Sequence, residues 1–134
     1  MGEEYKVCCD CGSVEATMYG VPRVTGICHC SDCRELRQVP FFQVVAYEEP
    51  NLKLTKGEDN VMGFQHPTKR MKRIFCKSCG ETIYSTNGMN WKIVSQLLVK
   101  KSNDNELPEI MKPRAHFFYS SRVIDVNDNL PGKD

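Results

Sequence analysis

Three cysteines stand within six residues of this chain, at Cys28, Cys30 and Cys33. The spacing C-x-C-x-x-C does not suit a local disulfide, because neighbouring peptide units hold the Cβ atoms of a C-x-C pair apart or at a strained angle. Three thiolates on one tight loop instead supply three corners of a tetrahedral zinc site. The loop therefore predicts a metal centre that lacks one local ligand.

Further cysteines supply a complete four-thiolate site. Cys76 and Cys79 form C-x-x-C followed by glycine, the common half of a zinc ribbon. A redox dithiol is the alternative, but such a pair usually opens a helix, and a strand is expected here. The partner pair comes from Cys8, Cys9 and Cys11. Spacing does not choose between Cys8 and Cys9, and the cysteine left over is expected to be a small buried apolar residue.

The fourth corner of the first loop has two interpretations. In a closed site, Cys8, His29, His66 or His116 supplies the ligand. His29 lies between two ligands, so its side chain is expected to point away from them, and no local spacing favours the others. We therefore favour an open site.

An open site with three thiolates favours a thiol substrate. The thiolates leave the zinc complex with a net negative charge, which weakens its power to acidify water, and hydroxide-forming sites rely mostly on neutral histidines. A soft, thiolate-rich ion prefers a soft fourth ligand. A bound thiol has a lowered pKa and stays a thiolate, ready to add to a carbon centre or to leave one.

Charged residues near the cysteines are the candidates for substrate contacts. Arg34 and Arg73 each stand close to a zinc ligand and could hold substrate carboxylates. The whole basic run 69–73 could bind phosphate, but a solvated strand edge explains it as simply. Asp32 is either a proton shuttle or a helix cap.

Composition points to one globular domain spanning residues 1–134. The chain has 134 residues, of which 40% are hydrophobic and 26% charged, as in ordinary soluble domains. No apolar run approaches the roughly 20 residues of a membrane span, and the polar N-terminus is not a secretory signal. Without an export signal we expect a cytoplasmic protein, and in that reducing compartment clustered cysteines favour metal over disulfide. The formal charge of +1 requires neither a nucleic acid nor a membrane as partner.

Short apolar–polar alternations separated by frequent turns predict a mainly β fold of small antiparallel sheets pinned by zinc. Ser31 and Asp32 are candidate caps of one short helix over 33–38, which Pro40 is expected to end. The stretch 91–99 fits a helix or a strand, and its β-rich surroundings favour a strand. The other expected strands lie within 5–19, where a knuckle separates two of them, and at 41–47, 52–54, 61–66, 82–85 and 116–123, while 24–27 leads into the cysteine loop.

With these motifs in place, the chain resembles the glutathione-dependent formaldehyde-activating family, which also includes centromere protein V. The resemblance rests on Cys9-x-Cys11-Gly12, on the segment 28–34, and on Arg73-x-Phe75-Cys76-x-x-Cys79-Gly80. The closing segment 116–122 and Leu130-Pro131 also fit. These motifs run in the family's order over nearly the whole chain.

The resemblance implies an Mss4-like fold and two zinc ions, one structural and one open to substrate. The family's namesake activity joins glutathione to formaldehyde as S-hydroxymethylglutathione, a carbon–sulfur lyase reaction in reverse. The implied structural ligands are Cys9, Cys11, Cys76 and Cys79, and the implied ligands of the open zinc are Cys28, Cys30 and Cys33.

One segment departs from the family pattern. Relatives often carry Ser-Gly-Ala before the Pro-Phe that follows the cysteine loop, whereas this chain has Arg37, Gln38 and Val39. These residues predict a bulkier and more polar pocket wall.

The leading hypothesis is a zinc-dependent carbon–sulfur lyase acting on an adduct of a thiol such as glutathione. The alternative is a non-catalytic zinc module that binds protein or nucleic acid. A methionine sulfoxide reductase on a related fold is weaker, because that chemistry needs a free catalytic cysteine and only one cysteine is spare.

Overall fold

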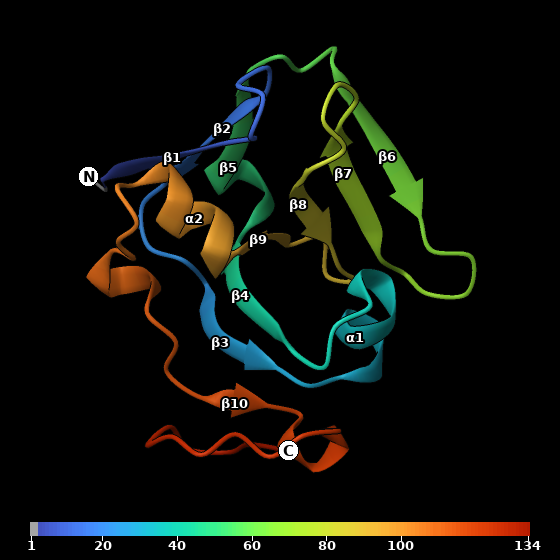
Figure 1. Cartoon of the computed structure of the whole chain (residues 1–134), viewed down its shortest axis with the longest axis vertical. Coiled ribbons are helices and arrows are strands. Elements are labelled where there is room, and N and C mark those ends of the chain that lie inside the picture. Colours follow the sequence, from blue (N-terminus) through green and yellow to red (C-terminus); the bar gives the residue numbers. More distant parts are fainter. Residues whose placement is uncertain (1–2) are drawn as a thin grey trace.

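A computed structural model describes residues 3–134 of the chain. This described part contains ten short strands and two short α-helices (Figure 1). Neither helix has the length and apolar character that crossing a bilayer requires. The elements are β1 (Glu4–Cys8), β2 (Glu15–Tyr19), β3 (Val24–Cys28), α1 (Ser31–Arg37), β4 (Phe42–Tyr47), β5 (Leu52–Lys56), β6 (Val61–Gln65), β7 (Lys72–Cys76), β8 (Thr82–Thr86), β9 (Lys92–Ser95), α2 (Gln96–Ser102) and β10 (His116–Phe117).

The strands form two sheets. The smaller has the order β1-β2-β5, and the larger has the order β10-β3-β4-β9-β8-β7-β6. Neighbouring strands are antiparallel throughout, except that the two-residue β10 runs parallel to β3. The prediction of a mainly β fold of antiparallel sheets is confirmed.

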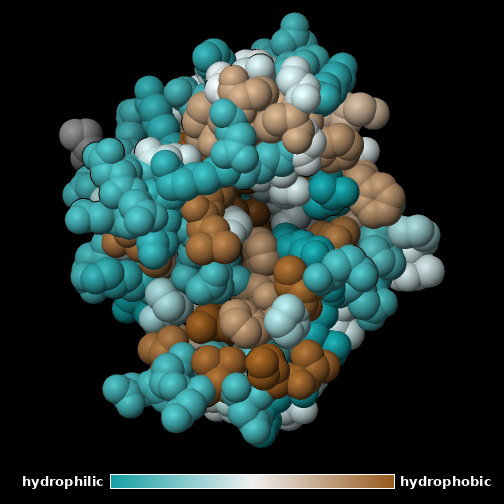
Figure 2. Space-filling view, viewed as in Figure 1, coloured by the Kyte–Doolittle hydropathy of each residue, from teal (hydrophilic) through white to brown (hydrophobic). Residues whose placement is uncertain are grey.

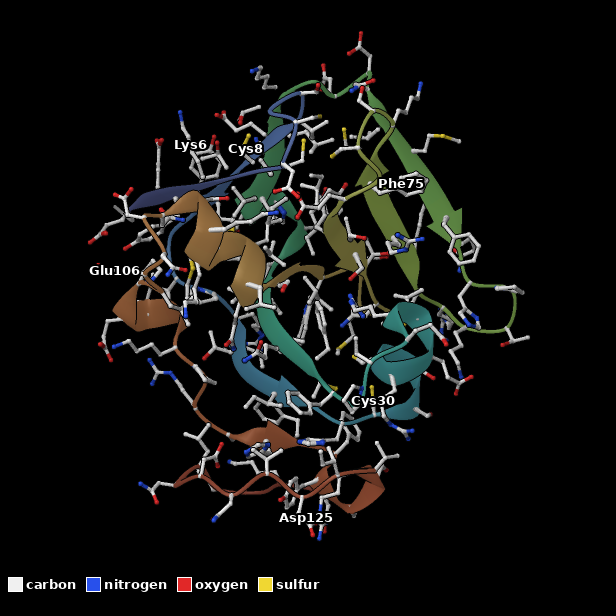
Figure 3. The ribbon with its side chains drawn as sticks, viewed as in Figure 1. Lys6, Cys8, Cys30, Phe75, Glu106 and Asp125 are labelled. Carbon is white, nitrogen blue, oxygen red and sulfur yellow. The ribbon has the colours of Figure 1, made fainter. Side chains whose placement is uncertain are left out.

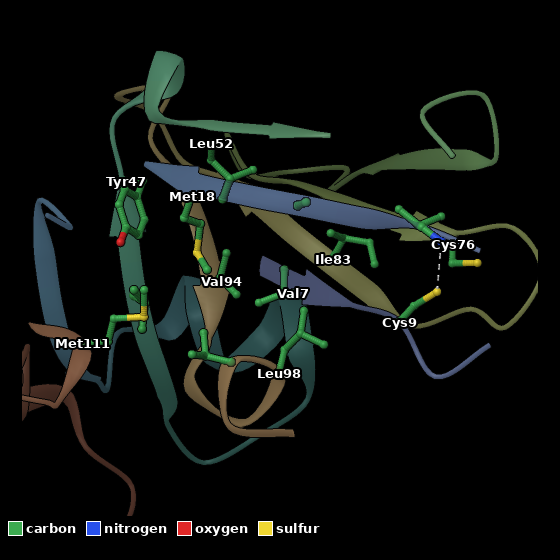
Figure 4. Packing of buried hydrophobic residues seen from close by; sticks show 14 residues of the cluster. Val7, Cys9, Met18, Tyr47, Leu52, Cys76, Ile83, Val94, Leu98 and Met111 are labelled. Atoms are coloured by element: carbon green, nitrogen blue, oxygen red, sulfur yellow. Dashed lines mark hydrogen bonds between the residues drawn. The ribbon is translucent and has the colours of Figure 1, made fainter. Parts of the chain in front are cut away.

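The main core lies where the smaller sheet and α2 pack against the larger sheet. Val7 and Met18 from the smaller sheet meet Tyr47 and Val94 from the larger one, and Leu98 of α2 closes the cluster (Figure 4). Cys9 and Cys76 stand at one edge of this cluster in the same view. The cysteine turns that contain Cys9 and Cys76 are therefore anchored in the main core.

A second, smaller core lies under α1. Leu36 packs there with Val44, Met71 and Ile93, and Cys28 and Cys33 belong to the same cluster. Figure 1 shows α1 and α2 apart from each other, and Figure 2 shows this face hollowed near its centre, with apolar surface inside. The two helices therefore leave part of the larger sheet uncovered.

The prediction of one strand over 91–99 is wrong. The strand ends at Ser95, whose hydroxyl accepts a hydrogen bond from the backbone N–H of Leu97 and so caps α2. β-branched Ile93 and Val94 suit the strand, and the residues after the cap suit the helix. Ser95, a good helix cap within the apolar run, was the sequence signal for this change from strand to helix.

The first helix begins earlier than the sequence predicts. Its cap is the Sγ atom of Cys30, which accepts from the N–H of Cys33, so neither Ser31 nor Asp32 fills that role. The helix ends at Arg37, before Pro40 is reached, and its C-cap Gln38 adopts a left-handed conformation with φ of 56°.

The prediction of a last strand over 116–123 is also wrong beyond its first two residues. Phe118 has φ of 55° and turns the chain into a 3₁₀ turn over Tyr119–Ser121. Its side chain is 52% exposed, so it is not the core residue its type suggests.

Candidate metal centre

Two turns from distant parts of the sequence bring four cysteines together. The ligand atoms of Cys9, Cys11, Cys76 and Cys79 all lie within 4.8 Å of one another. The Sγ atom of Cys11 is 3.6 Å from that of Cys9 and 3.6 Å from that of Cys76. A tetrahedral tetrathiolate with Zn–S bonds of about 2.3 Å has edges of about 3.8 Å. The donor set and its spacing therefore fit zinc.

The two turns are built alike. Gly12 and Gly80 have φ of 78° and 79°, the left-handed region that favours glycine. The N–H of Gly12 donates to the carbonyl oxygen of Cys9, as that of Gly80 does to Cys76. Each glycine closes a tight turn that holds two sulfurs on one side.

The structure places Cys9 in this cluster and Cys8 outside it. Cys9 is buried, and its sulfur accepts a hydrogen bond from the N–H of Val14. Cys8 is half-buried, and its thiol donates to the carbonyl oxygen of Cys9. The geometry thus selects between two cysteines that the spacing left equivalent.

The other cysteines meet where β3 passes into α1. The Sγ atom of Cys28 lies 3.3 Å from that of Cys30 and 3.4 Å from that of Cys33. The hydrogen bond from the N–H of Cys33 to the sulfur of Cys30 both caps the helix and orients that sulfur. Cys28 and Cys33 are buried and Cys30 is half-buried, so one side of the cluster is accessible.

Within residues 3–134, no histidine, cysteine or carboxylate joins these three sulfurs as a fourth ligand. His29 and His116 form a hydrogen bond with each other instead, with 2.9 Å between Nε2 of His29 and Nδ1 of His116. His66 accepts a hydrogen bond from the N–H of Thr68. Cys8 lies on β1, far from Cys30 beside α1 (Figure 3). The cluster offers three ligands and one free corner.

The three sulfurs shift one another's pKa values in opposite directions. Hydrogen bonds from the thiols of Cys28 and Cys33 lower the pKa of Cys30 to about 2. The bond to Cys30 in turn raises the pKa of Cys28 to about 11, and bonds to both neighbours raise the pKa of Cys33. Sulfurs this close compete for negative charge, which a divalent cation would allow all three to carry.

The side chain of Arg37 is turned away from the pocket, contrary to the sequence prediction. Its guanidinium lies 3.6 Å from the ring centroid of Phe42 and donates a hydrogen bond to Ser85. Burial lowers its pKa, and the nearby Cys33 sulfur opposes that effect. Neither Arg37 nor the next two residues line the pocket beside the cysteines, so the prediction of a bulkier, more polar wall is wrong.

The other charged candidates take separate places. The Nε atom of Arg34 donates to the carbonyl oxygen of His29 at 3.0 Å and so braces the cysteine loop. Arg73 lies on β7, where Nη1 donates to the hydroxyl of Thr82. Asp32 lines the pocket and pairs with Lys69 at 2.9 Å. Of the charged candidates, only Asp32 and the start of the basic run, Lys69 and Arg70, line the pocket.

A pocket of about 620 Å³ adjoins Cys28, Cys30 and Cys33. Its floor is the face of β3, β4 and β9, and residues 68–71 form part of its mouth. Sequence reasoning missed the pocket residues Met89 and Trp91, because nothing in an apolar side chain signals a pocket before the fold brings distant segments together.

Comparisons with known proteins agree with this architecture. The family model described as "Glutathione-dependent formaldehyde-activating enzyme" matches residues 4–121. An uncharacterized lyase of Schizosaccharomyces pombe is 29% identical over 99 residues, covering 72% of this chain and 69% of the relative. A crystal structure of a Rhodobacter sphaeroides protein superposes with a TM-score of 0.55 at 22% identity, covering 81% of this chain and 97% of that one. This structural likeness concerns the fold alone.

Proposed function

The chain belongs to the glutathione-dependent formaldehyde-activating enzyme family, and on that premise we propose that it is a zinc-dependent lyase that makes and breaks a carbon–sulfur bond. The observation that carries this proposal is the cluster of Cys28, Cys30 and Cys33, which has three thiols, no fourth ligand in the described residues and a pocket beside it. The lyase name of the fission yeast relative supports the reaction class.

We propose zinc for both clusters, because four thiolates suit a closed structural site and three suit an open one. When bound at the open site, zinc supplies a soft Lewis acid that lowers the pKa of a substrate thiol. The chain's own residues shape and orient that site. Cys30 caps α1, Arg34 braces the loop, and the half-buried Cys30 sulfur faces the accessible side.

The reaction joins a thiol to a carbonyl compound. The sulfur forms a bond with the carbonyl carbon, the π electrons move to the oxygen, and the oxygen takes up a proton in place of the one the thiol lost. Breaking the carbon–sulfur bond reverses each step. Asp32, the carboxylate on the pocket wall, is the residue we assign to this proton transfer, and Lys69 holds it in place.

Glutathione is the proposed thiol, and formaldehyde is the reference carbonyl partner that the family name supplies. Arg34 and Arg73 were the expected carboxylate ligands, but they do not line the pocket. Lys69 and Arg70 do line it, so we assign them to the substrate carboxylates. A cytoplasmic location remains a prediction.

The test compares two cysteine variants of the zinc-loaded chain. Exchange between free formaldehyde and its glutathione adduct, followed by NMR, should be accelerated by the wild-type protein. Cys30→Ser should lose at least about a hundredfold of that acceleration, because the open site loses a thiolate ligand. Cys8→Ser should keep it, since Cys8 lies outside both clusters. Full acceleration by Cys30→Ser, or none by the wild type with two zinc ions bound, would contradict the proposal.

A further inference from the structure

The pocket beside the three cysteines is more apolar than the adduct of glutathione with formaldehyde requires. Its volume is about 620 Å³ and its lining is mainly apolar, whereas formaldehyde adds to the sulfur only one carbon, which carries a hydroxyl. Glutathione is a polar peptide, and its amides and carboxylates need hydrogen-bond partners when buried. Most of the pocket wall offers none.

The floor of the pocket is an apolar row across three strands. Val24 of β3 pairs with Ala46 of β4, and Ala46 pairs with Ile93 of β9. Residues paired across antiparallel strands present their side chains on the same face. Trp91 extends this surface at the pocket wall, with the guanidinium of Arg23 lying 5.7 Å from its ring centroid.

Two large apolar side chains stand exposed on the same pocket. Met89 is 63% exposed and Phe118 is 52% exposed, and both line it. Phe118 is held at φ of 55°, a left-handed conformation that bulky residues rarely adopt. An exposed aromatic ring on a strained backbone, contiguous with an apolar floor, marks a surface that a ligand covers.

Charged groups are confined to one side of the pocket. Asp32, Lys69 and Arg70 come from the first turn of α1 and the segment between β6 and β7. The pocket thus presents three sulfurs, an apolar body and a charged rim, where Lys69 pairs with Asp32 and Glu35 and Arg70 adds a further cation. This arrangement suits a sulfur atom that joins an apolar group to a carboxylate-bearing one.

From this arrangement we propose that the group carried on the substrate sulfur is apolar and about the size of an aromatic ring. The substrate is then the adduct of glutathione with an aromatic or branched apolar aldehyde. This inference rests on the proposed function, which places the sulfur at Cys28, Cys30 and Cys33. The aldehyde carbon gains the sulfur and its oxygen gains a proton, as with formaldehyde, and no further reactant is needed.

Calorimetric titration of the zinc-loaded full chain tests the inference with three ligands. Glutathione itself tests the thiol site, while S-methylglutathione and S-benzylglutathione are stable adduct analogues that differ only in the apolar group. S-benzylglutathione should bind at least about tenfold more tightly than S-methylglutathione, because the pocket removes its ring from water.

Matched variants locate that preference. Met89→Ala and Phe118→Ala should each reduce the benzyl-over-methyl preference about threefold or more. Leu97→Ala should leave it unchanged, because Leu97 is as exposed as Met89 but lies on α2, outside the pocket. The affinities and the benzyl-over-methyl preference are both measured by binding, so neither depends on catalytic turnover.

The outcomes separate this inference from the proposed function. Equal affinity for the two conjugates, in protein that binds glutathione, would overturn the inference and leave the lyase proposal intact. No binding of glutathione or of either conjugate by zinc-loaded protein would overturn both. A benzyl preference that Met89→Ala and Phe118→Ala leave unaltered would also overturn the inference.

Discussion

The imidazoles of His29 and His116 share a hydrogen bond of 2.9 Å between Nε2 and Nδ1. Both rings are buried, and Nε2 of His116 lies 3.0 Å from the carboxylate of Asp128. His29 stands between two candidate metal ligands, so this chain of contacts ties the cysteine loop to the C-terminal segment. Burial lowers the pKa of His29, which keeps the ring neutral and suited to this role.

Weakening this chain of contacts should lower the zinc affinity of the cluster of Cys28, Cys30 and Cys33 and leave the four-cysteine cluster unchanged. Asp128→Ala removes the group that holds His116, so the affinity of the Cys28 cluster for zinc should fall about tenfold. Competition against a chromophoric chelator measures the loss for each of the two metals.

Asp125→Ala is the matched control, because Asp125 lies nearby but pairs with exposed Arg122. An equal loss from both clusters, or the same loss in the Asp125 variant, would show that His29 and His116 do not position the loop.

The two clusters should contribute unequally to folding. Cys76 is fully buried in the main core, so Cys76→Ser should lower the melting temperature by more than about 10 °C. Cys30→Ser, in the half-buried open cluster, should lower it by less than half as much. Differential scanning calorimetry provides the comparison, and equal losses would contradict the division into a structural and an open site.

Arg37 should help the second cluster to keep its charge. Its buried guanidinium follows Cys33 by one helical turn and favours thiolates over thiols. Arg37→Met keeps the packing on Phe42 but removes the charge, so thiols reprotonate more readily. Zinc should then leave this cluster at a pH about half a unit higher.

The measurement is a pH titration with a zinc indicator. Lys112→Met is the control, because Lys112 is exposed and lies far from Cys33 in the sequence. Unchanged release from Arg37→Met would mean that this cation does not influence the cluster.

Local chemistry explains which features the sequence predicted. The cysteine loop, the C-x-x-C turn and the glycines after them are short-range patterns, and the mainly β fold follows from alternation and turns. The structure brings Cys9, Cys11, Cys76 and Cys79 together, as the resemblance implied.

Features that depend on distant packing could not be read from the sequence. The choice between a polar and an apolar pocket wall depends on which way Arg37 turns, and that is set by Phe42 on β4 and Ser85 on β8. The pairing of His29 with His116 joins residues 87 positions apart. The prediction of a strand over 91–99 was wrong for a local reason, because Ser95 caps a helix that begins at Gln96.

The most direct test of the central claim is zinc K-edge X-ray absorption of the two-zinc protein, recorded with and without glutathione. One closed and one open cluster predict about 3.5 sulfur ligands per zinc on average, rising to about 4 when a thiol fills the free corner. S-methylglutathione, which lacks the thiol, is the control. An average of 4 sulfurs before any thiol is added, or no rise at saturating glutathione, would contradict an open three-thiolate site that receives a substrate sulfur.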